Sequence, residues 1–324
     1  MDYLKLKKYT DKEITKKEAL KLFSLKGSEA LLLFNIANEI RKKYCNDNFE
    51  TCIISNIKFG NCSEDCKFCA QGTNCNQNFN FYSLKDKEII IKEFKIAVQN
   101  KSTRFGLVAS GKKMRKGTKE FKNLLDTIKE MVAFNKEVEI CCSLGLLDRE
   151  ELIELKNSGV KRYHCNIQTS KEKYSTYAAT THSIDERLKT IKTAKKIGLK
   201  VCAGGIIGMG ESFEDRIDMA FLLKKLDIDG IPINILNPIK GTPYENKKVL
   251  SPFEILKTIA IFRIILKNKN IKIAAGRENI LKDFMGMTFI SGSNGMMIGG
   301  YLTLRGRNVT EDLKFIENLK MFFN

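Results

Sequence analysis

The chemistry of this chain is organised around Gly60-Asn-Cys-Ser-Glu-Asp-Cys-Lys-Phe-Cys-Ala-Gln-Gly72. Its cysteines, Cys62, Cys66 and Cys69, follow the spacing C-x3-C-x2-C and cannot all pair with one another as disulfides. Three thiolates in one loop can instead surround a soft metal centre. A [4Fe-4S] cluster normally binds four cysteines, so three would leave one iron open to a substrate or cofactor. The alternative is a zinc site with Cys75 as fourth ligand, although structural zinc loops usually contain two CxxC-like halves.

Length and composition limit the classes of protein that fit. The 324 residues suit one large α/β barrel or two ordinary domains, and a hydrophobic content of 43% allows a substantial core. No apolar run is long enough to span a membrane, and the first residues lack the apolar segment of a signal peptide. We therefore expect a cytoplasmic protein that has no membrane contact. In that compartment, ten cysteines indicate metal ligands rather than disulfides.

The formal net charge of +18 raises the question of nucleic-acid binding. The lysines are spread along the whole chain, and no stretch alternates aromatic with basic residues as a single-strand binding groove would. We therefore expect no nucleic-acid partner. The densest basic cluster, Gly111-Lys-Lys-Met-Arg-Lys-Gly117, is predicted to form a loop. It is either a solvated turn or a docking site for an acidic electron donor.

Strand-like and helix-like segments alternate along most of the chain. Residues 11–44 are predicted to be helical, because their apolar positions recur at helical spacing. The predicted strands are 51–57, 105–110, 138–144, 162–167, 200–207, 231–236 and 271–274, and the predicted helices are 85–100, 119–135, 149–157, 185–197, 213–226 and 252–267, with 278–285 and Phe289–Ile290 completing the series. Regular βα alternation indicates a parallel sheet with helices outside. About eight such units predict an α/β fold of the (β/α)8 TIM-barrel type.

The predicted strands carry residues that could hold a second metal centre. Cys141 and Cys142 lie in the third strand, Cys165 in the fourth and Cys202 in the fifth, and Arg277 follows the seventh. In a barrel of this type the chemistry gathers at the carboxyl ends of the strands. Side chains alternate between the two faces of a strand, so only one of Cys141 and Cys142 should enter the lumen. A lone buried cysteine is usually a small apolar side chain, but several on successive strands favour a second iron–sulfur centre.

The cysteine spacing, with Phe68 just before Cys69, resembles the radical S-adenosylmethionine superfamily. Over about residues 20–305 the chain further resembles the biotin synthase family. The motifs that carry this resemblance are 60–71, Ser102-Thr-Arg-Phe105, Val108-Ala-Ser-Gly111, 163–170, 202–211, Pro232-Ile-Asn234, Lys240-Gly-Thr-Pro243 and Ala275-Gly-Arg-Glu278. The resemblance implies sulfur insertion into dethiobiotin by 5'-deoxyadenosyl radicals. It also implies S-adenosylmethionine and a [4Fe-4S] cluster held by Cys62, Cys66 and Cys69 as cofactors.

The resemblance further implies an auxiliary cluster, commonly [2Fe-2S] with three Cys ligands and one Arg. Cys141, Cys202 and Arg277 match three of these positions, but Gly106 stands where the family usually has the remaining Cys. The fourth strand, Tyr163-His-Cys-Asn166, also departs from the family pattern. Our hypothesis is that the lost ligand is replaced from this region, in a relocated and larger centre. The sequence leaves Cys165, His164 and Cys142 open as the replacement.

Other roles follow from the same resemblance. Asn166 and Asn234 match groups that hold the ureido ring of dethiobiotin. The positions matched to S-adenosylmethionine contacts are Gln168 near the ribose, His182 near the carboxylate, and Gly204, Gly205 and Gly208, where the backbone lies close to the cofactor.

The remaining expectations concern organisation and partners. Residues 1–50 should form a helical extension, 51–302 the barrel and 303–324 a short tail. The resemblance implies a flavodoxin or ferredoxin as electron donor and a homodimer. The rival functions are a cofactor maturase or amino-acid mutase with a similar barrel, and a non-catalytic zinc- or nucleic-acid-binding protein.

Overall fold

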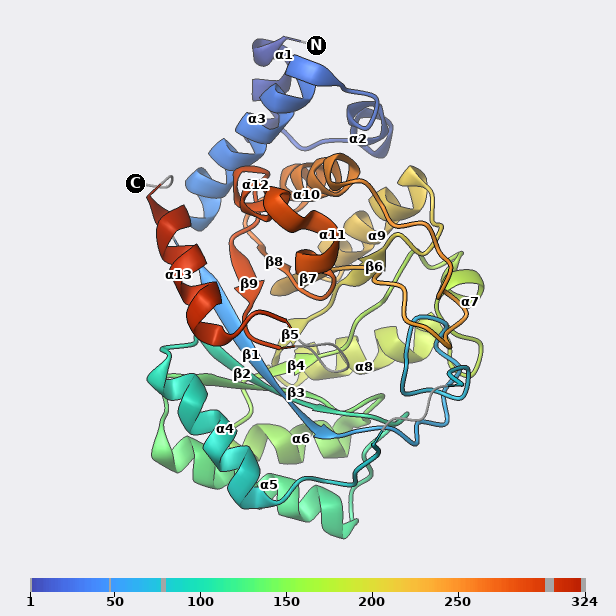
Figure 1. Cartoon of the computed structure of the whole chain (residues 1–324), viewed down its shortest axis with the longest axis vertical. Coiled ribbons are helices and arrows are strands. Elements are labelled where there is room, and N and C mark those ends of the chain that lie inside the picture. Colours follow the sequence, from blue (N-terminus) through green and yellow to red (C-terminus); the bar gives the residue numbers. More distant parts are fainter. Residues whose placement is uncertain (1, 47, 77–79, 301–305, 322–324) are drawn as a thin grey trace.

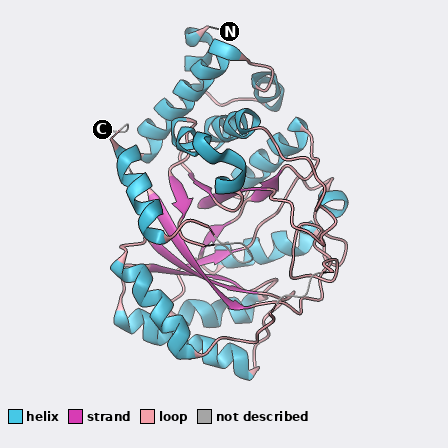
Figure 2. Cartoon of the chain, in the orientation of Figure 1, coloured by secondary structure: helices cyan, strands magenta, loops and turns pink. Residues whose placement is uncertain are grey.

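The structure is a computed structural model that describes residues 2–46, 48–76, 80–300 and 306–321. Its parallel strands form the centre of the molecule, and the helices surround them (Figures 1 and 2). The strands are β1 (Glu50–Lys58), β2 (Arg104–Ala109), β3 (Glu139–Ser143), β4 (Arg162–His164), β5 (Lys200–Cys202), β6 (Gly205–Ile207), β7 (Gly230–Ile235), β8 (Asn270–Ile273) and β9 (Gly295–Met297). Their order is β5-β4-β3-β2-β1-β9-β8-β7-β6, and β5 also pairs with β7, which closes the ring. The predicted (β/α)8 barrel is therefore confirmed.

Helices follow the strands and cover the outside of the ring. They are α4 (Lys87–Gln99), α5 (Lys119–Phe134), α6 (Arg149–Ser158), α7 (Tyr174–Tyr177), α8 (Ile184–Lys196), α9 (Phe213–Lys225), α10 (Pro252–Leu266), α11 (Arg277–Leu281), η2 (Lys282–Gly286), α12 (Met287–Ile290) and α13 (Val309–Lys320). None of the described helices is both long and apolar enough to cross a membrane.

The eighth strand of the barrel was not among the seven predicted strands. Phe289–Ile290 belongs to α12, and the strand that closes the ring is β9, whose residues pair with both β1 and β8. This strand has three residues and lies in a glycine- and serine-rich stretch, Ser291-Gly-Ser-Asn-Gly295. Such a segment shows no alternating pattern of its own. Its two neighbours in the ring decide its conformation.

Helices also precede the barrel, as α1 (Tyr3–Lys7), η1 (Lys8–Thr10), α2 (Lys16–Leu22) and α3 (Gly27–Cys45). They explain why α10 is apolar all round, with buried residues on every face, since α3 packs across the helix from outside. Arg263 of α10 is fully buried and donates to the carbonyl of Gly292 and to Asn294 Oδ1. The N-terminal helices therefore complete the core around α10.

The fifth barrel strand is interrupted between β5 and β6, where its backbone passes very close to β7. A Cβ on Gly204 would lie 1.9 Å from the carbonyl oxygen of Pro232. Pro232 also has no N–H to donate to a neighbouring strand, so the ladder breaks at this point. Cys202 and Gly230 pair just below the break, and Gly205 and Ile233 pair just above it. Closure of the ring therefore requires glycine at position 204.

We predict that Gly204→Ala destabilises the chain by about 1–3 kcal/mol, the usual cost of overpacking a core. Urea unfolding of the iron-free chain would measure this change. Gly300→Ala is the control, because an added Cβ there meets no atom of the described residues within 4 Å. Equal stability of the two variants would contradict the proposed close approach.

Candidate active site

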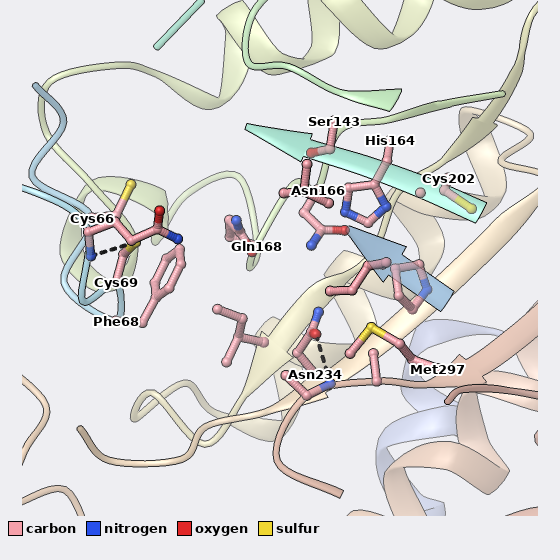
Figure 3. A pocket seen from close by; sticks show the side chains of 18 of the residues that line it. Cys66, Phe68, Cys69, Ser143, His164, Asn166, Gln168, Cys202, Asn234 and Met297 are labelled. Carbon is pink, nitrogen blue, oxygen red and sulfur yellow. Dashed lines mark hydrogen bonds between the residues drawn. The ribbon is translucent and has the colours of Figure 1, made fainter. Parts of the chain in front are cut away.

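A cavity of about 450 Å³ occupies the lumen of the barrel. It runs from the cysteine loop that follows β1, past amide side chains on β7 and just after β4, to thiols deep between the strands (Figure 3). On β1 the lining residues occupy alternate positions, Cys52 and Ile54. The cavity therefore connects the cysteine loop, the polar groups and the inner thiols in one space.

The cysteine loop is shaped by its own backbone. The Cys62 N–H donates to the Gln71 carbonyl at 3.2 Å, and the Cys69 N–H donates to the Cys66 carbonyl at 3.0 Å. The Gln71 N–H also donates to Cys69 Sγ at 3.4 Å. Gly72 leaves no space for a side chain, because its Cβ would lie 2.4 Å from the Glu64 carbonyl oxygen. All three predicted thiols line the cavity.

The segment between α7 and α8 fixes this loop in place. Asp65 accepts hydrogen bonds from the backbone N–H groups of Thr180 and Thr181, at 2.9 and 3.1 Å. The Lys67 N–H donates to the Ala178 carbonyl at 2.9 Å. The loop is therefore part of the barrel rim.

Cys66 and Cys69 of the loop are protonated without a metal. Burial raises the pKa of Cys66 to about 12 and that of Cys69 to about 11. Among the described residues, no three His, Cys, Asp or Glu side chains lie close enough together to bind a single metal ion.

His182 does not line the cavity. It lies buried between Glu64 and Arg187, with Nδ1 2.7 Å from Glu64 Oε2 and Nε2 2.7 Å from Arg187 Nη2. Burial and the Arg187 charge lower the pKa of His182, so the imidazole is neutral. It accepts from the guanidinium at Nε2 and donates from Nδ1 to the carboxylate.

Arg187 itself lines the cavity and is the cation that His182 orients. We had not predicted a role for it. The signal in the sequence is its position three residues after Ile184 and four before Ile191, in the apolar stripe of α8. A charged residue at such a position must find a polar environment inside the protein.

Amide side chains line the middle of the cavity (Figure 3). Asn166 Oδ1 accepts from the Gly204 N–H at 2.9 Å. Asn234 donates to the Gly205 carbonyl and accepts from the Ala275 N–H, both at 3.2 Å. These backbone bonds orient the two amides that the sequence predicted as substrate ligands.

Gln168 and Phe68 line the cavity nearer the cysteine loop. Gln168 has φ of +68°, and its Oε1 is buried with no hydrogen-bond partner among the described residues. A buried acceptor of this kind is available to a ligand.

Besides His182, four predicted site residues lie outside the cavity lining, namely Gly204, Gly205, Gly208 and Arg277. Gly204 and Gly205 pack against backbone, since a Cβ on Gly205 would lie 2.5 Å from the Gln168 carbonyl oxygen. Arg277 is fully buried at the start of α11, and its Nη2 lies 2.8 Å from Asp312 Oδ2 of α13. Gly276, with φ of +81°, turns the chain just before it. Arg277 thus stabilises the packing of α13, and this placement does not support its predicted role as a cluster ligand.

The inner end of the cavity carries a group of thiols and cations. Cys141 of β3, Cys202 of β5 and Cys52 of β1 all line it. Burial and the charges on Cys52 and Cys202 raise the pKa of Cys141, and burial and the charge on Cys202 raise that of Cys52. Lys272 Nζ lies 3.6 Å and Arg162 Nη1 4.0 Å from Cys202 Sγ. Burial raises the pKa of Cys202, but Lys272 opposes it, and with the hydrogen bond to His164 the pKa falls to about 5. Cys202 is therefore a thiolate at neutral pH.

Two other predicted thiols differ in their surroundings. Cys142 and Cys165 border the cavity, but both belong to the apolar core. Burial alone raises the pKa of Cys142 far above its ordinary value, with no effect from any other thiol. Cys165 interacts with Arg187 rather than with the inner thiols. Neither belongs to the group around Cys202.

The basic loop 111–117 carries less free charge than its sequence indicates. Lys113 pairs with Asp148 and Glu151 at 2.6 and 2.9 Å, and Lys116 pairs with two glutamates of α6 at 3.1 Å. These ion pairs neutralise much of the cluster, so it offers weak support for a docking site.

The barrel, its three-cysteine loop and the lined lumen define a radical S-adenosylmethionine enzyme. Residues 56–223 match the model of the Radical SAM superfamily, and residues 232–321 match the Biotin and Thiamin Synthesis associated domain. The chain belongs to the biotin synthase family and is a sulfurtransferase of that superfamily.

Curated relatives carry this assignment over nearly the whole chain. The biotin synthase of Carboxydothermus hydrogenoformans is 44% identical, with 95% of this chain and 94% of the relative covered. Those of Clostridium tetani and Endomicrobium trichonymphae are 46% and 44% identical, covering 96% and 98% of this chain and 94% and 97% of the relatives.

Solved structures support the fold. Methylornithine synthase superposes with a TM-score of 0.81 at 18% identity, covering 97% of this chain and 96% of that one. HydG, a maturase of the [FeFe]-hydrogenase, gives 0.81 at 16% identity, covering 98% and 74%. At such identities the barrel is shared across different reactions.

We predict that Cys202 makes the stability of the iron-free chain depend on pH. In the folded state the Cys202 thiol loses its proton near pH 5, whereas a thiol in the unfolded chain keeps its proton up to about pH 8.5. The folded state thus binds fewer protons between these two pH values. The contribution of Cys202 to the free energy of unfolding is therefore fully present above its pKa in the unfolded chain, and it is lost as the pH falls through its pKa in the folded chain. The difference in unfolding free energy between wild type and Cys202→Ala should grow with pH over this range.

Urea unfolding at several pH values would measure this difference. In a Lys272→Met background, this difference in unfolding free energy should increase less with pH, because the substitution removes the cation nearest to Cys202 Sγ. A difference that stays constant with pH would contradict the thiolate assignment.

Proposed function

We propose that this chain forms biotin by inserting sulfur into dethiobiotin, with S-adenosylmethionine as co-substrate. A [4Fe-4S] cluster held by Cys62, Cys66 and Cys69 would bind at the barrel rim, and an auxiliary iron–sulfur cluster would bind among the inner thiols. The observation that carries this proposal is the continuous cavity that joins the two groups of cysteines. When bound, the first cluster supplies the electron that cleaves S-adenosylmethionine, and the second supplies sulfur.

The rim residues suit the cofactor. Three thiols for a four-iron cluster leave one iron free for the amino and carboxylate groups of S-adenosylmethionine. Arg187, held by His182, provides a positive charge beside Cys66 in the same part of the cavity. Gln168 Oε1 provides a buried acceptor for a ribose hydroxyl. We therefore assign His182 an indirect role, as the residue that positions Arg187.

The middle of the cavity suits a cyclic urea. Such a ring has one carbonyl acceptor and two N–H donors. Asn166 keeps its Nδ2 for a ligand, because the backbone of Gly204 occupies its oxygen. The Asn234 amide is fixed by two backbone partners and keeps the second lone pair of its oxygen for an N–H donor. The two amides can therefore bind both sides of the ureido group.

The same arrangement explains how one lumen could serve two successive C–H cleavages. A substrate held at Asn166 and Asn234 lies between the rim and the inner thiols. Its reacting carbons would meet the radical source from one side and the sulfur source from the other. The chain's own residues hold the ring and exclude bulk water, so that a reactive carbon is not quenched elsewhere.

Two partners remain predictions. An acidic flavodoxin or ferredoxin is expected to deliver the electron, and a homodimer is expected from the family.

The direct test is an anaerobic assay with dethiobiotin, S-adenosylmethionine and dithionite, followed by mass spectrometry. We expect biotin together with methionine and 5'-deoxyadenosine. Formation of 5'-deoxyadenosine without a sulfur-containing product would reject the substrate while keeping the radical chemistry, and would favour a maturase or mutase.

A variant tests the substrate contact. We predict that Asn234→Ala lowers the rate of biotin formation by about tenfold, since a lost hydrogen bond costs about 1–1.5 kcal/mol. The iron content should stay unchanged. Asn123→Ala, at an exposed position on α5, is the matched control. A rate equal to that of the control would remove Asn234 from the substrate site.

A further inference from the structure

The auxiliary cluster lacks one ligand where the family usually has a cysteine on β2. Gly106 lines the cavity there, and among the described residues only Ile54 Cγ2 of β1 and the Ile53 carbonyl oxygen lie within 4 Å of an added Cβ. Its neighbour on the other side is Cys141 of β3. The missing ligand must therefore come from a strand close to β2 whose side chains face the same lumen.

Cys52 of β1 meets both conditions. In the register of β1 with β2, Ile54 pairs with Gly106 and Cys52 pairs with Arg104, one step deeper in the lumen. Side chains two residues apart share a face, so Cys52 and Ile54 both point inward. The cavity lining includes both, together with Cys141 and Cys202.

The positions of these thiols follow the layering of a TIM barrel. Alternate strands of such a barrel send four side chains into one layer. Counting β5 and β6 as one strand, the first, third, fifth and seventh strands contribute Cys52, Cys141, Cys202 and Lys272. Three thiols and one cation thus occupy one level of the lumen. Gly230 makes room for them, because its Cβ would lie 2.7 Å from Cys202 Sγ and 3.8 Å from Lys272 Nζ.

Two cations border this layer, with Lys272 Nζ 3.6 Å and Arg162 Nη1 4.0 Å from Cys202 Sγ. Each also pairs with a carboxylate, Lys272 with Glu50 at 3.7 Å and Arg162 with Glu139 at 3.6 Å. Arg162 Nε is buried without a hydrogen-bond partner in the described part of the chain. A buried guanidinium with a vacant donor is expected to face an anion.

We propose that Cys52 replaces the missing cysteine, so that Cys52, Cys141 and Cys202 together hold the auxiliary cluster. Lys272 lies where we expected the inward arginine and neutralises the charge. This inference rests on the proposed function for the presence of such a cluster. It replaces Cys165, which interacts with Arg187, and Cys142, which belongs to the apolar core. It also replaces His164, which hydrogen-bonds Cys202 but lies on β4, outside the layer of odd-numbered strands.

The test isolates the auxiliary cluster in a Cys62→Ala, Cys66→Ala, Cys69→Ala background. After anaerobic reconstitution, iron and sulfide analysis with Mössbauer spectroscopy should show one remaining cluster. Adding Cys52→Ala should remove most of this iron and sulfide, whereas adding Cys142→Ala or Cys165→Ala should leave both unchanged. Iron retained with an unchanged spectrum in Cys52→Ala would overturn the proposal, as would its loss in Cys165→Ala.

A rescue variant separates ligation from folding. Cys52→Ala combined with Gly106→Cys restores a thiol at the position of the usual family ligand and should recover the iron and sulfide. Continued absence of iron in a folded rescue variant, judged by circular dichroism, would also overturn the proposal. The outcome is independent of the substrate, since a wild type that keeps this cluster but forms no biotin would reject the proposed function alone.

Discussion

Closure of the parallel ring is the constraint on which the rest of the structure depends. It is achieved where β5 meets β7, at the pairing of Cys202 with Gly230 and the close passage of Gly204 beside Pro232. Once the ring is closed, every second residue of each strand must enter one lumen. Thiols, amides and cations that lie far apart in the sequence are brought together for this reason, and a single cavity serves the rim and the inner layer.

Electrostatics then distinguish the two groups of cysteines. The rim thiols Cys66 and Cys69 have raised pKa values, because burial acts on them without a nearby compensating cation of comparable effect. Cys202 has a lowered pKa, because Lys272 and Arg162 lie close to it. The inner end of the lumen thus favours anions even before a metal arrives. Chemically identical side chains acquire different properties from the charges that the strands place beside them.

The fold was largely predictable, because alternation of apolar segments persists through seven of the eight barrel strands. β9 was missed since three residues among glycines and serines have no pattern. The common position of Cys62, Cys66 and Cys69 on the cavity was predictable, because one local motif carries all three. The position of Arg277 was not predictable, because its direction depends on the turn at Gly276 and on Asp312. Cys52 and Arg187 were missed because their importance arises only when distant strands and helices meet.

The depth of the lumen has a consequence for the order of events. The inner layer lies beneath the amides, and the amides lie beneath the cysteine loop that Asp65 ties to Thr180 and Thr181. A group bound at the inner layer must therefore enter before ligands occupy the amide level and the rim, and it can be replaced only after those ligands have left. If the group at the inner layer is consumed in each turnover, its replacement would require that the product above it dissociates first.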